Sequence, residues 1–358
     1  MITFIIPRFH TNLTGLIKGL LKDKQEIEIL VLRVNSLENH SDVRPILLPK
    51  SFLMFSKIKW FMGSSFSAWD IPSLRILYKK ITKNNSQVLI IRLEKSMFSV
   101  VVLSIALIKI KRQVLIYTQR SVPEDNIWLR IIQIVLYKSM NWKWISPVKK
   151  DNYQSTLEYQ RWIPFATNVS HKSTFLSDQE NEIKIVTIGK LVSRKNLDMI
   201  IEIFQELDSS IFKLEIISEN STEEHNKTKL NLKNKINIGS KIKFIENVEH
   251  NFVRKILEKS HIFILLSQKE PASVSNLEAM ASGNLIIIGR DNGTANYIQD
   301  RKGGYIVAYN KEEVKEILRE IEKNPDIITE MGTNNIYEVE KNFENSIVSH
   351  QLLSFIHS

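Results

Sequence analysis

The chain has no cysteine among its 358 residues, so neither a disulfide framework nor a thiolate metal site is possible. It also has no long hydrophobic run, because the longest uncharged apolar segment, residues 97–108, is too short to span a bilayer. Residues 1–7 form a short apolar stretch without the basic leader of a secretory signal. We therefore expect a soluble, cytoplasmic protein in a reducing compartment.

The chain is basic but carries no nucleic-acid-binding signature. Its 49 Lys and Arg residues outnumber 39 Asp and Glu residues, which gives a formal net charge of +10. Such a surface attracts nucleic acid, anionic lipid or phosphorylated substrates. No zinc-finger, RRM-like or helix-turn-helix pattern is present, so we expect no nucleic-acid partner. Anionic membrane and phosphorylated substrates remain open.

Short apolar strands alternate with helical segments along the whole chain, without internal repeats or low-complexity linkers. The length fits two domains of about 150 residues or more. Strands that alternate with helices indicate parallel, doubly wound sheets of the α/β class. The predicted strands are residues 2–6, 27–32, 88–91, 114–117, 183–188, 212–217, 242–245, 262–266 and 285–288.

The stretch from 262 to 307 contains the most informative pattern. A buried strand is followed by a loop with Glu270, a helix that begins near Ser273 or Ser275 and ends at Gly283, and a second strand. Ligands of such sheets bind where loops leave the carboxyl ends of strands, and a helix N-terminus beside them favours an anionic group. A structural alternative stays open, because Ser275 and Glu278 have the spacing of a capping box.

The whole string resembles the signature of the retaining GT-B glycosyltransferases of family 4. That signature has two glutamates separated by seven residues, then Ala-Met-Ala-x-Gly, an apolar strand and a Gly-containing turn before Tyr-Ile. The matching positions are Glu270, Glu278, Ala279-Met280-Ala281-Ser282-Gly283, residues 285–288, Asn292-Gly293 and Tyr297-Ile298. One departure concerns the shape of the sugar pocket, since Ala272-Ser273 stand where the family has Phe-Gly.

The resemblance implies a GT-B fold, in which two Rossmann-like doubly wound domains face each other across a cleft. Residues 1–163 would form the acceptor-side domain, and residues 164–340 the nucleotide-sugar-binding domain. Residues 341–358 would form a terminal helix that crosses back to the first domain. The matching motifs are specific in the second half of the chain, whereas the first half resembles the family only in outline.

Several donor-side residues follow from the same resemblance. In the loop after strand 183–188, Gly189 is followed by Lys190 and Lys195, at the positions of the two cations that hold the donor diphosphate in the family. Lys190 replaces an arginine, so a charge is kept but a bidentate fork is lost. Glu278 would hold the ribose hydroxyls and Glu270 would orient the transferred sugar. The helix start would add its amides to bind the diphosphate; its residues are Ser273, Val274, Ser275 and Asn276.

On the acceptor side, Gly15 corresponds to a Gly-containing loop of the family, and Arg92 and Gln119 stand at predicted strand ends. Gly15 is equally compatible with ordinary helix-start chemistry. The family's histidine near Gln119 is missing here. His250 is predicted to be a surface residue. Trp142 and Trp144 are compatible either with a membrane interface or with packing in a core.

These features predict a retaining hexosyltransferase that moves a sugar from a nucleotide-sugar donor to a hydroxyl of a growing surface glycan, either free or linked to a lipid. Glu270, Lys195 and Lys190 would be the catalytic residues. No Asp-x-Asp motif occurs, so we expect neither a metal nor any other cofactor. Peripheral contact with the anionic inner face of the membrane is part of this hypothesis. The alternatives are a non-catalytic GT-B subunit that targets a partner enzyme and, less favoured, a sugar-nucleotide epimerase.

Overall fold

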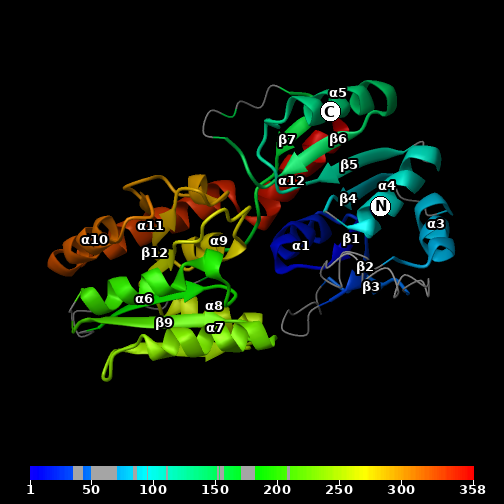
Figure 1. The fold of residues 1–358 in the computed structure, drawn as a ribbon. Coiled ribbons are helices and arrows are strands. Elements are labelled where there is room, and N and C mark those ends of the chain that lie inside the picture. Colours follow the sequence, from blue (N-terminus) through cyan, green and yellow to red (C-terminus); the bar gives the residue numbers. More distant parts are fainter. Residues whose placement is uncertain are drawn as a thin grey trace. The chain divides into compact units, whose positions relative to one another are not determined.

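The chain forms two compact units in the computed structural model (Figure 1). Unit 1 comprises Met1–Phe165 and Asn345–Ser358, and unit 2 comprises Ala166–Glu344. The structure describes residues 1–34, 43–49, 71–83, 87–94, 96–109, 112–150, 153, 157–170, 182–207 and 210–358. None of the helices in these ranges is long and apolar enough to cross a membrane.

Unit 1 is built on a parallel sheet in the order β3-β2-β1-β4-β5-β6-β7. Its strands read as nearly continuous apolar runs because helices cover both faces of such a sheet. The order reverses between β1 and β4, as in doubly wound folds that bind nucleotides. The strands are β1 (Ile2–Arg8), β2 (Ile27–Arg33), β3 (Ile46–Leu47), β4 (Val88–Arg92), β5 (Gln113–Tyr117), β6 (Lys143–Ser146) and β7 (Gln160–Trp162).

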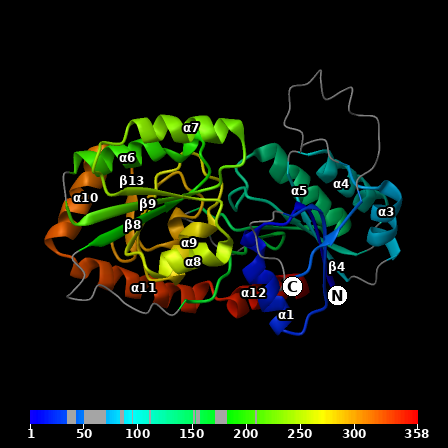
Figure 2. The ribbon, with the colours of Figure 1, turned by 90° about the horizontal axis from the view of Figure 1, so that it is seen from below.

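The helices of unit 1 lie on two sides of this sheet (Figure 2). One side carries α3 (Leu74–Lys83), α4 (Met97–Lys109) and α5 (Ile127–Met140), whose apolar side chains share one core cluster with the sheet. The other side carries α1 (Thr14–Lys22), which follows the 3-10 helix η1 (Thr11–Leu13), and α12 (Asn345–His357). Because Gly19 has no side chain, α1 and α12 approach closely: a Cβ there would lie 2.1 Å from the Asn345 carbonyl oxygen.

Unit 2 repeats the same strand order, β10-β9-β8-β11-β12-β13, again with all strands parallel. Its switch point, the place where the strand order reverses, therefore lies between β8 and β11. The strands are β8 (Ile183–Ile188), β9 (Phe212–Ser218), β10 (Ile242–Glu246), β11 (Ile262–Leu265), β12 (Leu285–Gly289) and β13 (Gly304–Val307). Two parallel α/β sheets of this kind confirm the predicted fold class.

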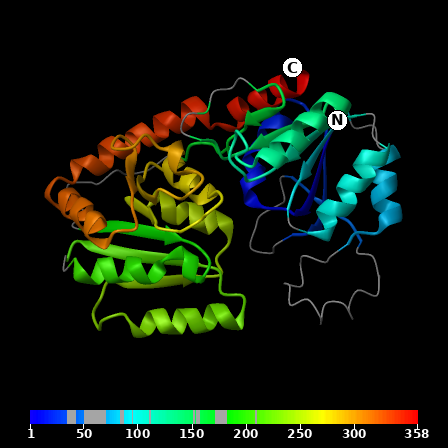
Figure 3. The same cartoon turned by 45° about the horizontal axis from the view of Figure 1, so that its top comes forward.

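Two groups of helices cover the unit 2 sheet, and Figure 3 shows α7 and α11 at opposite sides of it. One group consists of α6 (Leu197–Glu206), α7 (Glu223–Asn234) and α10 (Lys311–Lys323). The other consists of α8 (His250–Glu258), α9 (Val274–Ala281) and α11 (Asp326–Asn342). Short 3-10 helices η2 (Ser193–Lys195) and η3 (Ala295–Tyr297) lie in the connecting loops.

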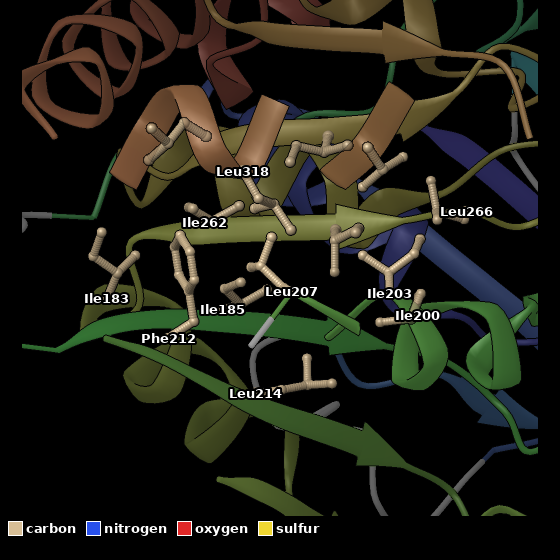
Figure 4. Packing of buried hydrophobic residues seen from close by; sticks show 14 of the residues in the cluster. Ile183, Ile185, Ile200, Ile203, Leu207, Phe212, Leu214, Ile262, Leu266 and Leu318 are labelled. Atoms are coloured by element: carbon tan, nitrogen blue, oxygen red, sulfur yellow. The ribbon is translucent and has the colours of Figure 1, made fainter. Parts of the chain in front are cut away.

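The core between the sheet and α6 consists of branched aliphatic side chains from alternating strand positions (Figure 4). Ile183, Ile185 and Leu214 of the sheet belong to the same buried cluster as Ile200 and Ile203 of α6. These side chains are at most 3% exposed, so the rigid scaffold extends to the strand ends that carry the loops. The loops of the candidate site are thereby anchored at both ends.

Gly283 ends α9 in the way that the sequence predicts. It has a positive φ of 68°, which glycine adopts without a Cβ penalty. The Gly283 N–H donates to the Met280 carbonyl at 2.9 Å, and the Asn284 N–H donates to Ala279 at 3.1 Å, which completes a Schellman motif. This turn sets the entry of β12 directly behind the helix of the two-glutamate motif.

The structure corrects the membrane interpretation of Trp142 and Trp144. Trp142 is 2% exposed and Trp144, in β6, is 7% exposed, and both belong to the core cluster of unit 1. Because both indoles are buried in this core, neither is available for a membrane interface. The tryptophan of this region that is exposed is Trp128, on α5.

Candidate active site

The loops that follow β8 and β11 are joined at the switch point of unit 2. The Asn196 side-chain amide donates to the Leu266 carbonyl at 2.8 Å, and the Gln268 N–H donates to the Arg194 carbonyl at 2.8 Å. Asn196 has a left-handed conformation, with φ of 49°, which turns the chain from η2 into α6. Ligands of doubly wound sheets bind outside the carboxyl ends of the strands at this point. The candidate donor residues therefore lie where the fold itself favours a ligand.

Lys195 and Glu270 form a buried ion pair between these two loops. The Lys195 Nζ lies 2.7 Å from Glu270 Oε2, and each residue is 8% exposed. Arg194 also donates to the same carboxylate oxygen. Burial lowers the pKa of the Lys195 ammonium, and the negative charge of Glu270 opposes that shift. Glu270 is therefore not a solvated loop carboxylate, because it is buried and pairs with two cations.

Gly189 makes room for the stem of Lys195. A Cβ at Gly189 would lie 3.0 Å from the Lys195 Cδ, so the lysine stem runs across the bare backbone of this glycine. The Gly189 N–H donates to the Ile217 carbonyl at 3.0 Å, which keeps the residue in line with the sheet. A side chain at this position would displace the ammonium that pairs with Glu270.

Lys190, the other predicted phosphate cation, is more exposed. Its Nζ lies 3.5 Å from Glu219 Oε2, just beyond the end of β9, and its side chain is 48% exposed. An exposed pair of this kind contributes about 1 kcal/mol at most. The long lysine stem can therefore exchange Glu219 for another anion at little cost.

Glu278 is paired with His250 and does not cap its own helix. The N-cap of α9 is Ser273, Ser275 lies inside the helix, and the Ser273 side chain makes no capping hydrogen bond. The capping-box alternative is therefore wrong. The carboxylate of Glu278 lies 2.6 Å from His250 Nε2, and it is the acceptor when it is ionised. The His250 side chain is 24% exposed, so it lies partly at the surface, as predicted, while its ring contacts Glu278.

The first turn of α9 is fixed by the turn at 292–294. Asn276 is fully buried, and its side-chain amide donates to the Thr294 carbonyl at 2.9 Å, while the Thr294 hydroxyl donates to the Ser273 carbonyl at 3.2 Å. The hydroxyls of Ser273 and Ser275 are 2.8 Å apart. Val274 and Ser275 are partly exposed, so the first-turn amides, and not the Asn276 side chain, are the groups open to a ligand.

Three predicted acceptor-side residues lie in unit 1. Arg92 ends β4, is 6% exposed, and its Nε lies 2.6 Å from Glu94 Oε1. Among the described residues its Nη1 is buried without a hydrogen-bond partner. Gln119 follows β5 beside Tyr117, whose pKa burial raises to about 12. Gly15 is buried in the first turn of α1 without a positive φ, so its backbone has the ordinary conformation of a helix start.

The structure adds residues that sequence reasoning did not select: Arg194, Glu219, His250 and Thr294. Arg194 is adjacent to Lys195, and its charge was a signal that could have been used. The other three reach the site from β9, from α8 and from the turn after β12. Their pairing depends on the fold, since 28 positions separate His250 from Glu278.

A hollow of about 700 Å³ lies beside the loop that follows β8, between the start of α6 and one side of α7. Arg194 reaches it, whereas Lys195, Glu270 and Glu278 are not among its lining residues. In the parts of the chain that the structure describes, no three or more His, Asp or Glu side chains gather as metal ligands would.

The family model described as "Glycosyl transferases group 1" matches residues 171–338, which is nearly all of unit 2. Unit 2 is similar to this family. The similarity supports a glycosyl transfer function for the chain, because the matched segment contains both glutamates and both predicted lysines. Comparison with curated protein sequences finds no match.

Solved GT-B glycosyltransferases have the same fold over almost the whole chain. A glycosyltransferase from Rickettsia africae superposes with a TM-score of 0.73 at 14% identity, over 99% of this chain and 97% of the other. A sucrose-phosphate synthase from Thermosynechococcus elongatus gives 0.73 at 14% identity, with coverages of 99% and 98%. The HepE protein of Anabaena, solved with UDP and glucose, gives 0.73 at 10% identity, with coverages of 100% and 99%. At these identities the likeness shows the GT-B fold alone.

Proposed function

We propose that the chain is a retaining, metal-independent glycosyltransferase that moves a sugar from a nucleotide-sugar donor to a hydroxyl of a growing surface glycan. The observation that carries this proposal is the buried Lys195–Glu270 pair at the switch point of a group 1 glycosyltransferase unit. Relatives of the same fold were solved with UDP, and another, WaaG, is described as involved in lipopolysaccharide biosynthesis.

In the reaction, the bond between the anomeric carbon and the diphosphate oxygen breaks, and a bond to the acceptor oxygen forms on the same face of the sugar. The acceptor proton passes to the departing phosphate oxygen, so no protein base is required. The negative charge that develops on the leaving group needs preorganised positive groups. Lys195, Lys190 and the first-turn amides of α9 supply them. Glu278 binds the ribose hydroxyls, and Glu270 orients the sugar.

The three cations of the site are paired with two carboxylates. Lys195 and Arg194 share Glu270, while Lys190 is paired with Glu219. A diphosphate must therefore compete with carboxylates for its contacts, and Lys190 is the cation that changes partner most easily. Because carboxylates already occupy these cations, a second candidate function also stands: a non-catalytic subunit that targets a partner glycosyltransferase.

Calorimetry and thermal shift with UDP, GDP, ADP and CMP sugars test the proposal. We expect one nucleotide to bind the wild type, Glu278→Ala to abolish the binding, and the matched variant Glu223→Ala, on the exposed side of α7, to retain it. A retaining mechanism follows if NMR shows that the product keeps the anomeric configuration of the donor. Unchanged transfer after treatment with a chelator supports metal independence. Binding of none of the nucleotides would favour the non-catalytic subunit.

A further inference from the structure

The outward side of α5 is an exposed apolar stripe. Ile127 is 61% exposed, Trp128 73% and Val135 56%, and Ile131 and Ile132 are exposed as well. Their spacing places these five side chains on one side of the helix. The opposite side, with Gln133 and Leu136, faces the core of unit 1. Isolated exposed apolar residues are ordinary, but a contiguous stripe with a tryptophan indicates an interaction surface.

The neighbouring helices on the same side of the unit 1 sheet extend this stripe. On α4, Val100 is 55% exposed and Leu107 is 45% exposed. On α3, the exposed large apolar residues are Leu74, Ile76 and Tyr78. The three helices lie on one side of the sheet, opposite α1 and α12 (Figure 2). We refer to the outward sides of α3, α4 and α5 together as the α3–α5 face.

The charge of this face has one sign. The sequences of the three helices contain seven Lys and Arg residues and neither Asp nor Glu. Arg75, Lys79, Arg130 and Lys138 are exposed. The carboxylates of adjoining elements are engaged in contacts: Glu28 with Lys80, Glu158 with the Tyr137 hydroxyl, and Asp125 with Lys150. The positive charge of the face is therefore not balanced from within the three helices.

The same asymmetry separates the two units. Unit 1 contains 25 Lys and Arg residues and 11 Asp and Glu residues, a net charge of +14. Unit 2 contains 24 and 28, a net charge of −4. The whole basic excess of the chain thus belongs to the unit that carries the apolar stripe. A donor phosphate site in unit 2 does not account for it.

We propose that the α3–α5 face docks unit 1 onto an anionic lipid bilayer. Aliphatic side chains and a tryptophan that enter the interfacial region, combined with Lys and Arg that attract anionic headgroups, are the two features that hold peripheral helices on membranes. A second copy of the same face would repel it, because both would carry only positive charge. The proposal gives a surface for the peripheral membrane contact that is expected from the sequence, and it does not depend on glycosyl transfer.

Co-sedimentation of the full chain with vesicles tests the proposal. The vesicles contain either phosphatidylcholine alone or equal parts of phosphatidylcholine and phosphatidylglycerol. We expect binding to the anionic vesicles only, with a loss of binding as salt is raised. Val135→Glu is expected to weaken the binding about tenfold or more. Leu230→Glu is the matched control, because Leu230 is 52% exposed on α7 of unit 2 and the charge change is the same.

A second pair of variants tests the charge. Each of Lys79→Gln and Lys138→Gln is expected to weaken vesicle binding about fivefold. Lys227→Gln on α7, where the lysine is 73% exposed, is expected to leave it unchanged. Nucleotide binding, measured by calorimetry, is expected to be the same in all of these variants. A protein that binds vesicles but no nucleotide would therefore contradict the proposed function and leave the docking face intact.

Two results would overturn the proposal. In one, the wild type shows no preference for anionic vesicles, or Val135→Glu and Leu230→Glu weaken binding equally. In the other, light scattering shows a self-associated wild type that Val135→Glu converts to monomer without any change in vesicle binding. The face would then be a contact between protein chains.

Discussion

Units 1 and 2 have the same order of parallel strands but carry different information in their sequences. Unit 2 contains the family motifs, and its two predicted lysines and two glutamates lie in the loops and the helix around its switch point. Unit 1 matches the family only in outline, yet it carries the basic excess of the chain and an exposed apolar face. The strand order thus fixes where a ligand binds, whereas the loops and outer helices decide which ligand or surface is recognised.

The comparison also separates two kinds of positive charge. In unit 2 the site cations are paired with individual carboxylates, Lys195 and Arg194 with Glu270 and Lys190 with Glu219, which suits the exchange of one anion for another. In unit 1 the cations of α3, α4 and α5 are spread over a helical surface whose own sequence has no carboxylate. A dispersed field of this kind suits an extended anionic surface better than a small molecule.

The largest expected effect comes from glycines that hold each unit together. A Cβ at Gly304, where φ is 153°, would lie 1.9 Å from the Ile286 carbonyl oxygen. We expect Gly304→Ala to destabilise unit 2 by about 4 kcal/mol or more. Gly19→Ala should destabilise unit 1 by about 3 kcal/mol, because it forces α1 and α12 apart. Gly239→Ala, with nothing within 4 Å of the added Cβ, should cost about 1 kcal/mol.

Urea titrations followed by two probes can assign these losses to the units. All six tryptophans belong to unit 1, so their fluorescence reports unit 1, whereas far-UV circular dichroism reports both units. Gly304→Ala should move a dichroism transition and leave the fluorescence transition in place. A fluorescence midpoint that moves equally with both variants would show that the units unfold as one.

The next largest effect is expected for Lys195→Met, which keeps most of the stem but removes the ammonium from unit 2. Transfer should fall about 10²–10³-fold, as for the loss of one preorganised donor to the leaving group. Binding of a nucleoside without phosphates should be unchanged. Lys227→Met provides the matched control on an exposed part of α7. Equal losses for the nucleoside and the nucleoside diphosphate would contradict a phosphate role for Lys195.

The elements that sequence predicted best are those whose pattern is local. Strand β8 has the predicted bounds, since an apolar run between polar flanks defines both of its ends. Helix α7 was missed because its residues are mostly polar and only His225 and Leu232 are buried. Helix α11 was missed because Gly332 and two adjacent asparagines interrupt the apolar pattern of its sequence. One of them, Asn335, is buried, and its side-chain amide donates to the Asn284 and Gly303 carbonyls.

The candidate site shows the same limit. Motif resemblance selected Lys195, Glu270 and Glu278, but it could not show that Arg194 shares Glu270 or that His250 holds Glu278. These pairs join positions up to 76 residues apart and depend on which loops meet at the switch point. The exposed stripe of α5 could not be predicted from the sequence for a similar reason. A helix that is apolar all round does not reveal which side is covered.

A moderate effect is expected for His250→Ala, which removes the hydrogen bond to Glu278. The carboxylate would lose its orientation, so the KM for the donor should rise about tenfold while kcat changes little, as for the loss of a hydrogen bond to a charged group. His250→Gln, which keeps an N–H donor, should recover part of the loss. A kcat that falls while KM is constant would instead indicate that His250 acts in the chemical step.

The smallest effect is expected for Glu219→Gln, and it bears most directly on the contrast between paired and unpaired charge. In the wild type the Lys190 Nζ lies 3.5 Å from the Glu219 carboxylate. The substitution keeps the size of the Glu219 side chain but removes its charge, which releases Lys190. If a diphosphate must replace Glu219 as the partner of Lys190, its affinity should rise about threefold, within the range of an exposed ion pair. The gain should disappear at high salt and in the double variant with Lys190→Gln, because only the competition for Lys190 produces it. A gain that persists in the double variant would arise from elsewhere in unit 2 and would remove Lys190 from the phosphate site.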